Sequence, residues 1–387
     1  MTNKTIYLSS PHMGSKELTL VTEAFHTNWI APVGPHIDAF EKELSSYVGG
    51  SEVAVLSSGT AAIHLSLVLL GVQEEDYVIC QSMTFSASAN PIRYQGAIPI
   101  FVDSEEDTWN MCPEALEKAI QGCLTGDLPG PWTGKARKPK AIIPVHLYGV
   151  PAKMKEIMAI AQKYEIPVIE DAAEAMGAHI QGKHCGTFGD FGVFSFNGNK
   201  IITTSSGGAL ISPSKASIAA AKHLATQARD EAPHYQHSKI GYNYRMSNVL
   251  AGIGRGQLEV LDERVRARRA NFEFYRSALR EIQGISFLEE LPDYYANRWL
   301  SCIIVDPAKT GGVDREQLRR AMQEVAIESR PLWKPMHMQP VFENFPYFGK
   351  KVSELLFERG LCLPSGSNLS EGDLGRVVEV ILSKVNP

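Results

Sequence analysis

The first residue that could do chemistry is Lys200, which lies in the segment DFGVFSFNGNKIITTSSGGAL, residues 190–210. After its opening aspartate this segment holds apolar, hydroxyl, amide and glycine residues, and no acidic residue lies within nine positions of the lysine on either side. Burial of an ammonium group without a partner is costly. A lysine in such surroundings is suited to act as a nucleophilic amine, which forms Schiff bases with aldehydes.

Two further groups of polar residues follow predicted buried strands. The run SSGT, residues 57–60, offers three hydroxyl groups and a glycine at the start of a predicted helix. Free N–H groups and the helix dipole favour an anion at such a place. Asp171 closes the apolar run IPVIED and puts a carboxylate at the edge of the predicted sheet. Each group also has a structural interpretation, because serine, threonine and aspartate are common N-caps of helices.

Together, the three groups indicate a more specific chemistry than any one of them does alone. An anion cradle, a carboxylate and an amine that binds aldehydes match pyridoxal 5′-phosphate, whose protein partners include a lysine imine and an acid at the pyridinium nitrogen. The SSGT run fits neither the Walker phosphate-binding loop nor the GxGxxG fingerprint, so ATP and NAD have no support.

The elements that must position these residues alternate between short apolar runs and helical patterns. Strand, helix and strand at this spacing indicate βαβ units and a mostly parallel sheet, whose ligands bind beyond the carboxyl ends of the strands. Strands are predicted at residues 52–56, 76–80, 97–103, 140–149 and 166–171, and helices at residues 61–71 and 152–165. The Gly-, Pro- and Lys-rich stretch 124–140 is predicted to be an exposed loop within this unit.

The pattern changes near Ser247. Apolar residues then recur at helical spacing across some thirty residues, which indicates one long helix that links two domains or lines an interface. Strands near residues 285–290 and 298–306 and a helix over 314–325 follow. We therefore expect an α/β fold with two domains: residues 1–250 form a large domain, and residues 251–387 form a smaller α+β domain.

Composition excludes several other classes of protein. Among the 387 residues, 38 Lys and Arg stand against 43 Asp and Glu, and the net charge of −5 does not predict a nucleic-acid partner. The basic run RVRARRA, residues 264–270, is interpreted as a solvated helix face. None of the six cysteines has zinc-ligand spacing, so no metal is expected. The start of the sequence lacks an apolar signal region, and no uncharged apolar run reaches about 18 residues, so we expect a cytoplasmic protein without a membrane span.

The chain also resembles a known family nearly from end to end, the DegT/DnrJ/StrS nucleotide-sugar aminotransferases. These enzymes use pyridoxal phosphate and have the fold of type I, a large domain with a mostly parallel mixed sheet flanked by helices and a smaller C-terminal α+β domain. Within the family the chain looks most like the 4-aminotransferases of the bacillosamine pathway. The motifs that carry the resemblance are NWIAPVGP (28–35), SSGTAA (57–62), TFSASANP (84–91), VHLYG (145–149), IEDAAEA (169–175), FSFNGNK (194–200), GYNYRMSN (241–248) and RPLWKPMH (330–337).

The resemblance implies roles for individual residues. Lys200 would hold the cofactor covalently and move protons at the substrate carbon, and Asp171 would keep the ring nitrogen protonated. Glu174 would lie near the cofactor's hydroxyl group. Phe85 would stack on the ring, although core packing is its other interpretation. Ser58, Gly59, Thr60 and Ser195 would hold the phosphate, and Asn243 would reach the phosphate of a neighbouring subunit, so that a homodimer would share its active sites.

The implied substrates are a UDP-ketosugar and L-glutamate. The enzyme would transfer an amino group from glutamate to C4 of a UDP-4-keto-6-deoxy-N-acetylhexosamine. Alternatives are a 3-keto nucleotide sugar, a sugar dehydratase, which Lys200 disfavours because relatives with that activity have lost the lysine, and a regulatory protein that keeps the fold without catalysis. Candidate contacts of the nucleotide sugar are Arg245, Arg330, Trp333, Lys334 and His337, with Trp29 and His12 as weaker candidates.

Overall fold

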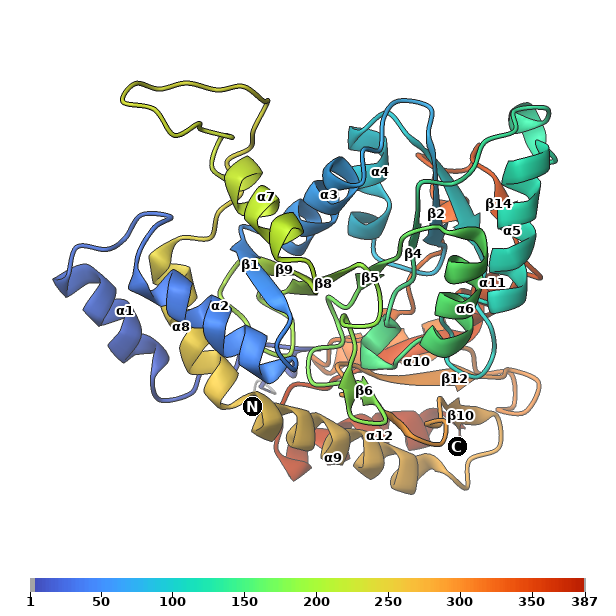
Figure 1. Cartoon of the computed structure of the whole chain (residues 1–387). Coiled ribbons are helices and arrows are strands. Elements are labelled where there is room, and N and C mark those ends of the chain that lie inside the picture. The colour runs from blue at the N-terminus through green and yellow to red at the C-terminus, as the bar shows by residue number, and fades with distance from the viewer. Residues whose placement is uncertain (1–3, 386–387) are drawn as a thin grey trace.

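The larger unit is built on a central mixed sheet. The computed structural model describes residues 4–385 (Figure 1). The strands of this sheet are β1 (Glu52–Leu56), β2 (Tyr77–Gln81), β3 (Ile98–Val102), β4 (Ala141–Ile143), β5 (Ile169–Asp171), β8 (Phe191–Ser195), β9 (Gly208–Ser212) and β14 (Tyr347–Phe348). Their order is β14-β3-β2-β4-β5-β8-β9-β1, in which two hydrogen-bonded ladders meet through parallel bridges between β4 and β5. Strand β9 runs antiparallel to β1 and β8, while the other pairings are parallel.

Helices cover both faces of this sheet. They are α3 (Gly59–Leu69), α4 (Asn90–Tyr94) and α7 (Lys215–Ala225) on one face, and α5 (Pro113–Thr125) and α6 (Met154–Tyr164) on the other. The alternation of side chains along β2 accounts for the two cores: Val78 and Cys80 pack with α3 and α7, whereas Tyr77 and Ile79 pack with α5 and α6. The expected α/β fold with a mostly parallel mixed sheet is confirmed.

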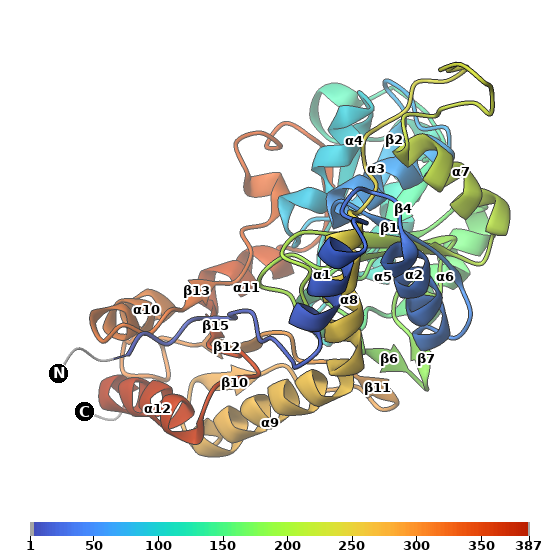
Figure 2. The ribbon, with the colours of Figure 1, turned by 90° about the vertical axis from the view of Figure 1, so that its left-hand side faces the viewer.

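The predicted long helix is in fact two helices. Helix α8 (Asn248–Glu259) and helix α9 (Leu261–Leu279) meet at Val260, which has φ −106° and ψ 4°. Apolar spacing missed this break, because both helices bury one side and a single non-helical residue barely changes the phase of the pattern. Helix α8 packs between α1 (Glu17–His26) and α2 (Pro35–Tyr47), and α9 continues beneath the smaller unit (Figure 2).

The smaller unit has its own antiparallel sheet and its own core. Strands β10 (Ile285–Phe287), β12 (Ser301–Val305), β15 (Gly360–Leu363) and β13 (Arg330–Pro331) lie in that order. Its helices are α10 (Arg315–Glu324), α11 (Val352–Arg359) and α12 (Glu371–Val385). Asp314 and Gln317 form a reciprocal capping box at the start of α10, which explains why this helix begins where the sequence predicted.

The chain crosses between the two units more often than one boundary at residue 250 describes. Ile6 forms a bridge with Ile327 of the smaller unit and belongs to its core. Strand β14 joins the edge of the large sheet at β3. Strand β11 (Tyr294–Tyr295) pairs with β6 (His179–Ile180), which also pairs with β7 (Lys183–His184). The two units are therefore tied together at several points.

Two exposed segments lie at the periphery. The predicted loop 124–140 is anchored by Trp132 of the short helix η2 (Gly130–Trp132), whose indole N–H donates to the Asn344 carbonyl and whose ring stacks on Phe345. The loop between α7 and α8 projects away from the rest of the molecule (Figure 1). Within residues 4–385 no helix has both the length and the apolar character needed to cross a membrane.

Candidate active site

A cavity of about 280 Å³ lies at the carboxyl ends of β1, β5 and β8. Its position follows the rule for parallel sheets, and the start of the antiparallel β9 reaches the same edge. The structure brings many of the predicted site residues together in its lining, namely Ser58, Gly59, Thr60, Phe85, Asp171, Glu174, Ser195, Lys200 and Trp333. Residues separated by more than 270 positions in the sequence thus surround one space.

The SSGT run forms the N-terminus of α3, and its serine has the structural role that the sequence left open. The Ser58 hydroxyl oxygen accepts the N–H of Ala61 at 3.0 Å, so Ser58 is the N-cap of the helix. The N–H groups of Gly59 and Thr60 lie in the first turn, where a helix offers no carbonyl partner. They line the cavity. Helix capping and anion binding are therefore compatible at this end of α3.

Close backbone packing shapes this cradle. A Cβ atom on Gly208 would lie 2.4 Å from the Gly59 nitrogen and 2.7 Å from the Phe194 carbonyl oxygen, so only glycine lets β9 approach the start of α3. A Cβ atom on Gly59 would lie 3.2 Å from the Cβ of Ser195, which brings that hydroxyl-bearing residue beside the helix N-terminus. Backbone donors and hydroxyl groups at a helix N-terminus suit a phosphate group.

Asp171 is buried at the end of β5 and its carboxylate is held on both sides. One oxygen accepts the Ala173 N–H at 3.1 Å, and the other accepts the Ser88 hydroxyl at 2.5 Å. No helix begins at Asp171 in the described chain, so its local role is to close a short turn rather than to cap a helix. The hydroxyls of Thr84 and Ser88 are 2.6 Å apart. Sequence analysis missed these two residues, although both lie in the TFSASANP motif.

Lys200 has closer charged neighbours than its local sequence suggested. Its Nζ lies 3.4 Å from Glu174 Oε1 and 4.1 Å from the centre of the Trp299 ring, and its side chain is 12% exposed. The acid is absent from the flanking residues because the fold brings it from the segment after β5. Burial raises the pKa of the Glu174 carboxyl, although Lys200 and the Tyr148 N–H act in the opposite direction. The pocket is therefore polar, and the expectation of uncharged surroundings was wrong.

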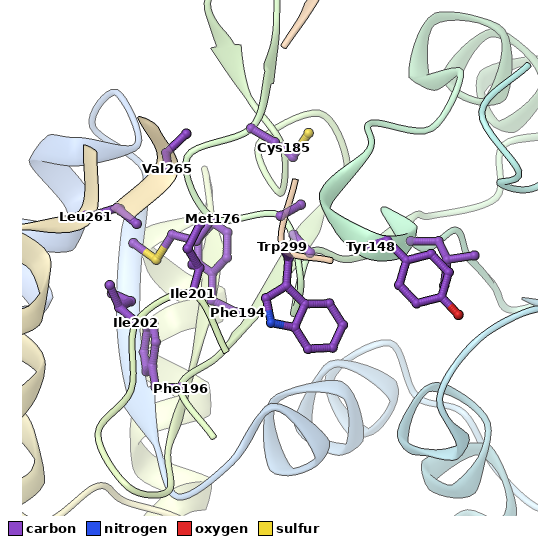
Figure 3. Close-up of a cluster of buried hydrophobic side chains, with 14 of the residues drawn as sticks. Tyr148, Met176, Cys185, Phe194, Phe196, Ile201, Ile202, Leu261, Val265 and Trp299 are labelled. Carbon is purple, nitrogen blue, oxygen red and sulfur yellow. The ribbon is translucent and has the colours of Figure 1, made fainter. Parts of the chain in front are cut away.

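The backbone of Lys200 is anchored by the two residues that follow it. Ile201 and Ile202 are buried in the same hydrophobic cluster as Phe196 (Figure 3). Lys200 itself lines the cavity. The Lys200 N–H donates to the Asn197 carbonyl at 3.0 Å. This anchoring fixes the start of the lysine side chain.

Aromatic side chains form one wall of the cavity. Tyr148 stacks between Trp299 and Trp333, with ring centres 6.4 and 6.1 Å apart, and its hydroxyl oxygen accepts the Trp333 N–H at 2.8 Å. Phe85 lies 5.4 Å from Trp333 and is 53% exposed, so it faces the open cavity rather than the core. Tyr148 and Trp299 were not predicted as site residues, although Tyr148 lies in the VHLYG motif.

Three predicted substrate contacts lie outside the lining of this cavity. Arg245 is paired with Glu41 at 2.6 Å and donates to the carbonyl of Val55. The ring of His337 stacks on Tyr347, its Nδ1 lies 2.7 Å from the Ser82 hydroxyl, and burial lowers its pKa. Neither residue lines the cavity. Trp29 is 45% exposed in the loop after α1 and is also outside the lining.

The remaining candidates lie near the cavity rim or elsewhere on the surface. Arg330 lines a second cavity of about 130 Å³, which shares Asn199, Trp299 and Trp333 with the first. Lys334 is half-buried and directly follows Trp333 of the aromatic wall in the sequence. Asn243 is exposed at the end of the projecting loop. His12 lies 3.0 Å from the Ser367 hydroxyl, away from both cavities.

Comparison of the sequence with a family model and with known proteins identifies the family of this chain. The model of the DegT/DnrJ/EryC1/StrS aminotransferase family matches residues 11–382. EpsN of Bacillus subtilis, described as a candidate pyridoxal phosphate-dependent aminotransferase, is 51% identical over 98% of this chain and 96% of its own length. GDP-perosamine synthase of Escherichia coli O157:H7 is 35% identical over 98% of both chains.

Solved structures lead to the same conclusion. A DegT/DnrJ/EryC1/StrS aminotransferase from Brucella abortus superposes with a TM-score of 0.88, at 28% identity and 96% coverage of both chains. The chain belongs to the DegT/DnrJ/EryC1/StrS aminotransferase family. It is a sugar aminotransferase, and its cofactor is pyridoxal 5′-phosphate.

The residues of the cavity fit this cofactor. The cradle at α3 and Ser195 would hold the phosphate, and the buried Asp171 carboxylate would face the ring nitrogen. Lys200 supplies the amine, and Phe85 and Trp333 supply flat apolar surfaces near it. Each of these chemical groups has a counterpart in what the cofactor presents.

Proposed function

We propose that this protein transfers an amino group from glutamate to C4 of a UDP-4-keto-6-deoxy-N-acetylhexosamine. The observation that carries the proposal is the convergence of Lys200, Asp171 and the α3 cradle on one cavity, next to a second cavity whose lining includes Arg330. The finer choice of sugar and nucleotide is supported by the resemblance of the FSFNGNKIITT and RPLWKPMH segments to enzymes of that specificity.

The chain's own residues would perform distinct tasks in this reaction. Pyridoxal phosphate supplies an electron sink for the carbon that carries the amino group. Asp171, held by Ser88 and the Ala173 N–H, would keep a proton on the ring nitrogen. Lys200 would move a proton at the reacting carbon, and Glu174 next to it can exchange a proton with the amine because burial raises the pKa of its carboxyl. The aromatic wall would limit water around these groups.

Arg330, beside the site, supports a diphosphate-linked substrate. Arg330 lies on the rim of the second cavity with a planar guanidinium, which binds phosphate oxygens in pairs. Its partner Glu328 is 3.0 Å away, so a diphosphate would compete with this exposed ion pair. Exposed ion pairs contribute little stability. Replacement of Glu328 by a diphosphate as the partner of Arg330 would therefore cost little free energy. Lys334 follows Trp333 in sequence and would extend the cationic surface.

A homodimer with shared sites is part of the proposal. The projecting loop carries Tyr235 and Ile240, which are 79% and 87% exposed, and α1 carries Leu18 and Phe25, which are 77% and 61% exposed. Large apolar side chains on the outside of a protein often mark a contact surface. A second copy that covers them would bring Asn243 toward the neighbouring cofactor phosphate. A cytoplasmic location would give such a dimer access to nucleotide sugars.

A second candidate substrate is a GDP-linked 4-keto-6-deoxyhexose. The observation that favours it is the 35% identity with GDP-perosamine synthase across nearly the whole chain. The experiment that separates the two candidates offers the purified protein both 4-keto sugars in parallel, with glutamate, and identifies the products by mass spectrometry and NMR. We expect nitrogen at C4 of the UDP-linked acetamido sugar. Preferred conversion of the GDP sugar would reverse the assignment. Conversion of a 3-keto nucleotide sugar offered in the same way, without reaction of either 4-keto sugar, would support the 3-keto alternative.

The same samples test the regulatory alternative. A catalytic protein would show a visible absorbance band from its bound cofactor, and glutamate would shift that band even without a sugar. A protein that binds a nucleotide sugar but whose band does not respond to any amino donor would be a sensor rather than a transferase.

A further inference from the structure

A closed ring of hydrogen bonds lies behind Lys200. The guanidinium of Arg268, in the middle of α9, donates to the Trp299 carbonyl at 2.5 Å and to the Ser9 hydroxyl at 2.9 Å. The Ser9 hydroxyl in turn donates to the Asn199 carbonyl at 2.7 Å, and the Trp299 indole N–H donates to the same oxygen at 2.7 Å. Two arms that leave one guanidinium thus meet again at the carbonyl that immediately precedes Lys200.

The buried arginine has no acidic partner to explain its place. Arg268 is among the largest fully buried side chains, and within residues 4–385 no carboxylate lies within ion-pair distance of it. Burial lowers the pKa of its guanidinium to about 9. Burial of an arginine is costly unless its N–H groups are satisfied. The bonds to Trp299 and Ser9 satisfy the two terminal nitrogens of the guanidinium, while its Nε has no hydrogen-bond partner among the described residues.

The ring fixes both the backbone and the surroundings of the lysine. The Asn199 carbonyl accepts two donors, which uses both of its lone pairs, and the peptide plane that joins it to Lys200 is rigid. The same ring holds Trp299 by its carbonyl and by its indole N–H. The face of that indole lies 4.1 Å from Lys200 Nζ. One guanidinium is therefore connected, through these bonds, both to the carbonyl before Lys200 and to the indole beside its amine.

We propose that Arg268 is a positioning residue for Lys200, acting through Ser9 and Trp299 on the Asn199 carbonyl. It holds the amine in the orientation in which it captures the cofactor and moves protons. Since this inference concerns the amine and the cofactor, it does not depend on which nucleotide sugar is the substrate.

The first test removes one arm of the ring at a time. Ser9→Ala deletes the hydroxyl, and Trp299→Phe deletes the indole N–H while an aromatic face remains beside the amine. The matched control for Ser9→Ala is Ser10→Ala, which removes a neighbouring hydroxyl that contacts Asn368 instead. The measured quantity is the rate at which the full chain, freed of cofactor, captures added pyridoxal 5′-phosphate, followed by its visible absorbance. Thermal unfolding of each variant is recorded in parallel.

We expect each single arm variant to capture the cofactor about 5- to 10-fold more slowly, the effect of one lost hydrogen bond on a productive orientation. In the reloaded enzyme, kcat should fall while the KM for the amino donor changes little. The Ser10→Ala control should match the parent protein. The double variant Ser9→Ala/Trp299→Phe should be no slower than the product of the single effects, because either loss already opens the ring.

The second test changes the arginine itself. Arg268→Lys keeps the charge but replaces the planar fork, so it should resemble the double variant in capture rate. Arg276→Met, on the exposed side of the same helix and paired with Glu273, serves as its control. Parental capture rates in both Ser9→Ala and Trp299→Phe would overturn the proposal, whether or not the Arg268 variant folds. A folded Arg268→Lys protein with parental capture would overturn it as well.

Discussion

At the scale of single residues, Asp171 depends on a neighbour that the sequence alone did not single out. Its carboxylate accepts the Ser88 hydroxyl at 2.5 Å, and a bond to an ionised acceptor is stronger than one between neutral groups. Asp171→Asn should lower kcat/KM by at least about 100-fold, because an amide does not keep the ring nitrogen protonated. Ser88→Ala should lower it about 10-fold, the effect of a lost charge-assisted hydrogen bond.

Steady-state kinetics with a saturating amino donor measures both effects. Ser86→Ala, which removes a hydroxyl in the same short helix η1 (Ser86–Ser88), is the control and should keep parental activity. An Asp171→Asn protein with near-parental activity would show that the carboxylate only closes its local turn.

A buried histidine gives the protein a predictable sensitivity to acid. Burial lowers the pKa of His64 below its ordinary 6.5; its Nδ1 lies 3.2 Å from the Tyr244 hydroxyl and its Nε2 lies 2.6 Å from the Gln95 amide nitrogen. The unfolded chain therefore binds a proton at higher pH than the folded chain does. The stability contributed by the neutral ring is complete above about pH 6.5 and is lost as the pH falls toward the folded-state pKa.

Replacing His64 should weaken the dependence of stability on pH. In His64→Gln the free energy of unfolding, measured with urea, should fall less between pH 7.5 and pH 5.5 than in the parent protein. His26→Gln, at an exposed position of α1, should leave the dependence unchanged. An unchanged slope in His64→Gln would mean that other groups govern acid sensitivity.

Much of the candidate site could be predicted from residue types and from their positions at the ends of strands. Lys200, Asp171 and SSGT each follow a strand, so the rule for strand ends places them together without knowledge of the tertiary structure. The acid beside the lysine comes from a different strand end, and the arginine behind it comes from α9. No spacing in the sequence encodes such contacts, because they arise only when separate segments pack.

At the scale of elements, the meeting of β9 and α3 depends on one glycine. A methyl group on Gly208 would meet the Gly59 nitrogen at 2.4 Å and the Ser58 carbonyl carbon at 2.5 Å, and both are backbone atoms that do not rotate away. Gly208→Ala should therefore displace the phosphate cradle. We expect cofactor affinity to fall about 10-fold or more and stability to fall by about 1–3 kcal/mol.

Equilibrium titration with pyridoxal 5′-phosphate and denaturant unfolding measure these two quantities. Gly375→Ala in α12, where an added Cβ has no neighbour within 4 Å, is the control and should leave both unchanged. If Gly208→Ala binds the cofactor normally, then the cradle adjusts more easily than its packing implies.

Elements with a strong local signal were predicted well, and elements defined by tertiary contacts were not. Strand β1 begins and ends at the predicted residues, since the apolar run from Val53 to Leu56 is bounded by polar residues on each side. The predicted strand 140–149 is ordered as a strand only over β4, and residues 147–149 instead turn as the short helix η3 (Leu147–Gly149) with Tyr148 at φ 55°. That conformation places the Tyr148 ring in the aromatic wall, which apolar character alone does not reveal.

At the scale of the whole molecule, Asn243 should act on the site of a partner. It is exposed on the projecting loop and lies outside the cavity of its own chain. A 1:1 mixture of Lys200→Ala and Asn243→Ala protomers, exchanged into dimers, should recover about one quarter of parental activity, because half of the dimers are mixed and each has one intact site. Activity assays before and after subunit exchange measure the recovery.

Native mass spectrometry is the measurement that checks whether mixed dimers form. Mixed dimers without recovered activity would place the function of Asn243 within its own subunit. A protein that stays monomeric at the assay concentration would argue against shared sites altogether.

The short strand β14 has a consequence for how the protein behaves in a crowded solution. It covers the outer edge of β3, whose sequence IPIFV is uncharged, apolar and rich in β-branched residues. Asp103, just after β3, fastens this cover: its carboxylate accepts the N–H groups of Lys350, Val352 and Ser353. If this fastening opened, the bare edge would be a template for strands of other molecules. A small part of the C-terminal unit therefore covers an edge of the large sheet, and we expect loss of the Asp103 carboxylate, for example in Asp103→Ala, to appear first as aggregation in light scattering rather than as lost catalysis.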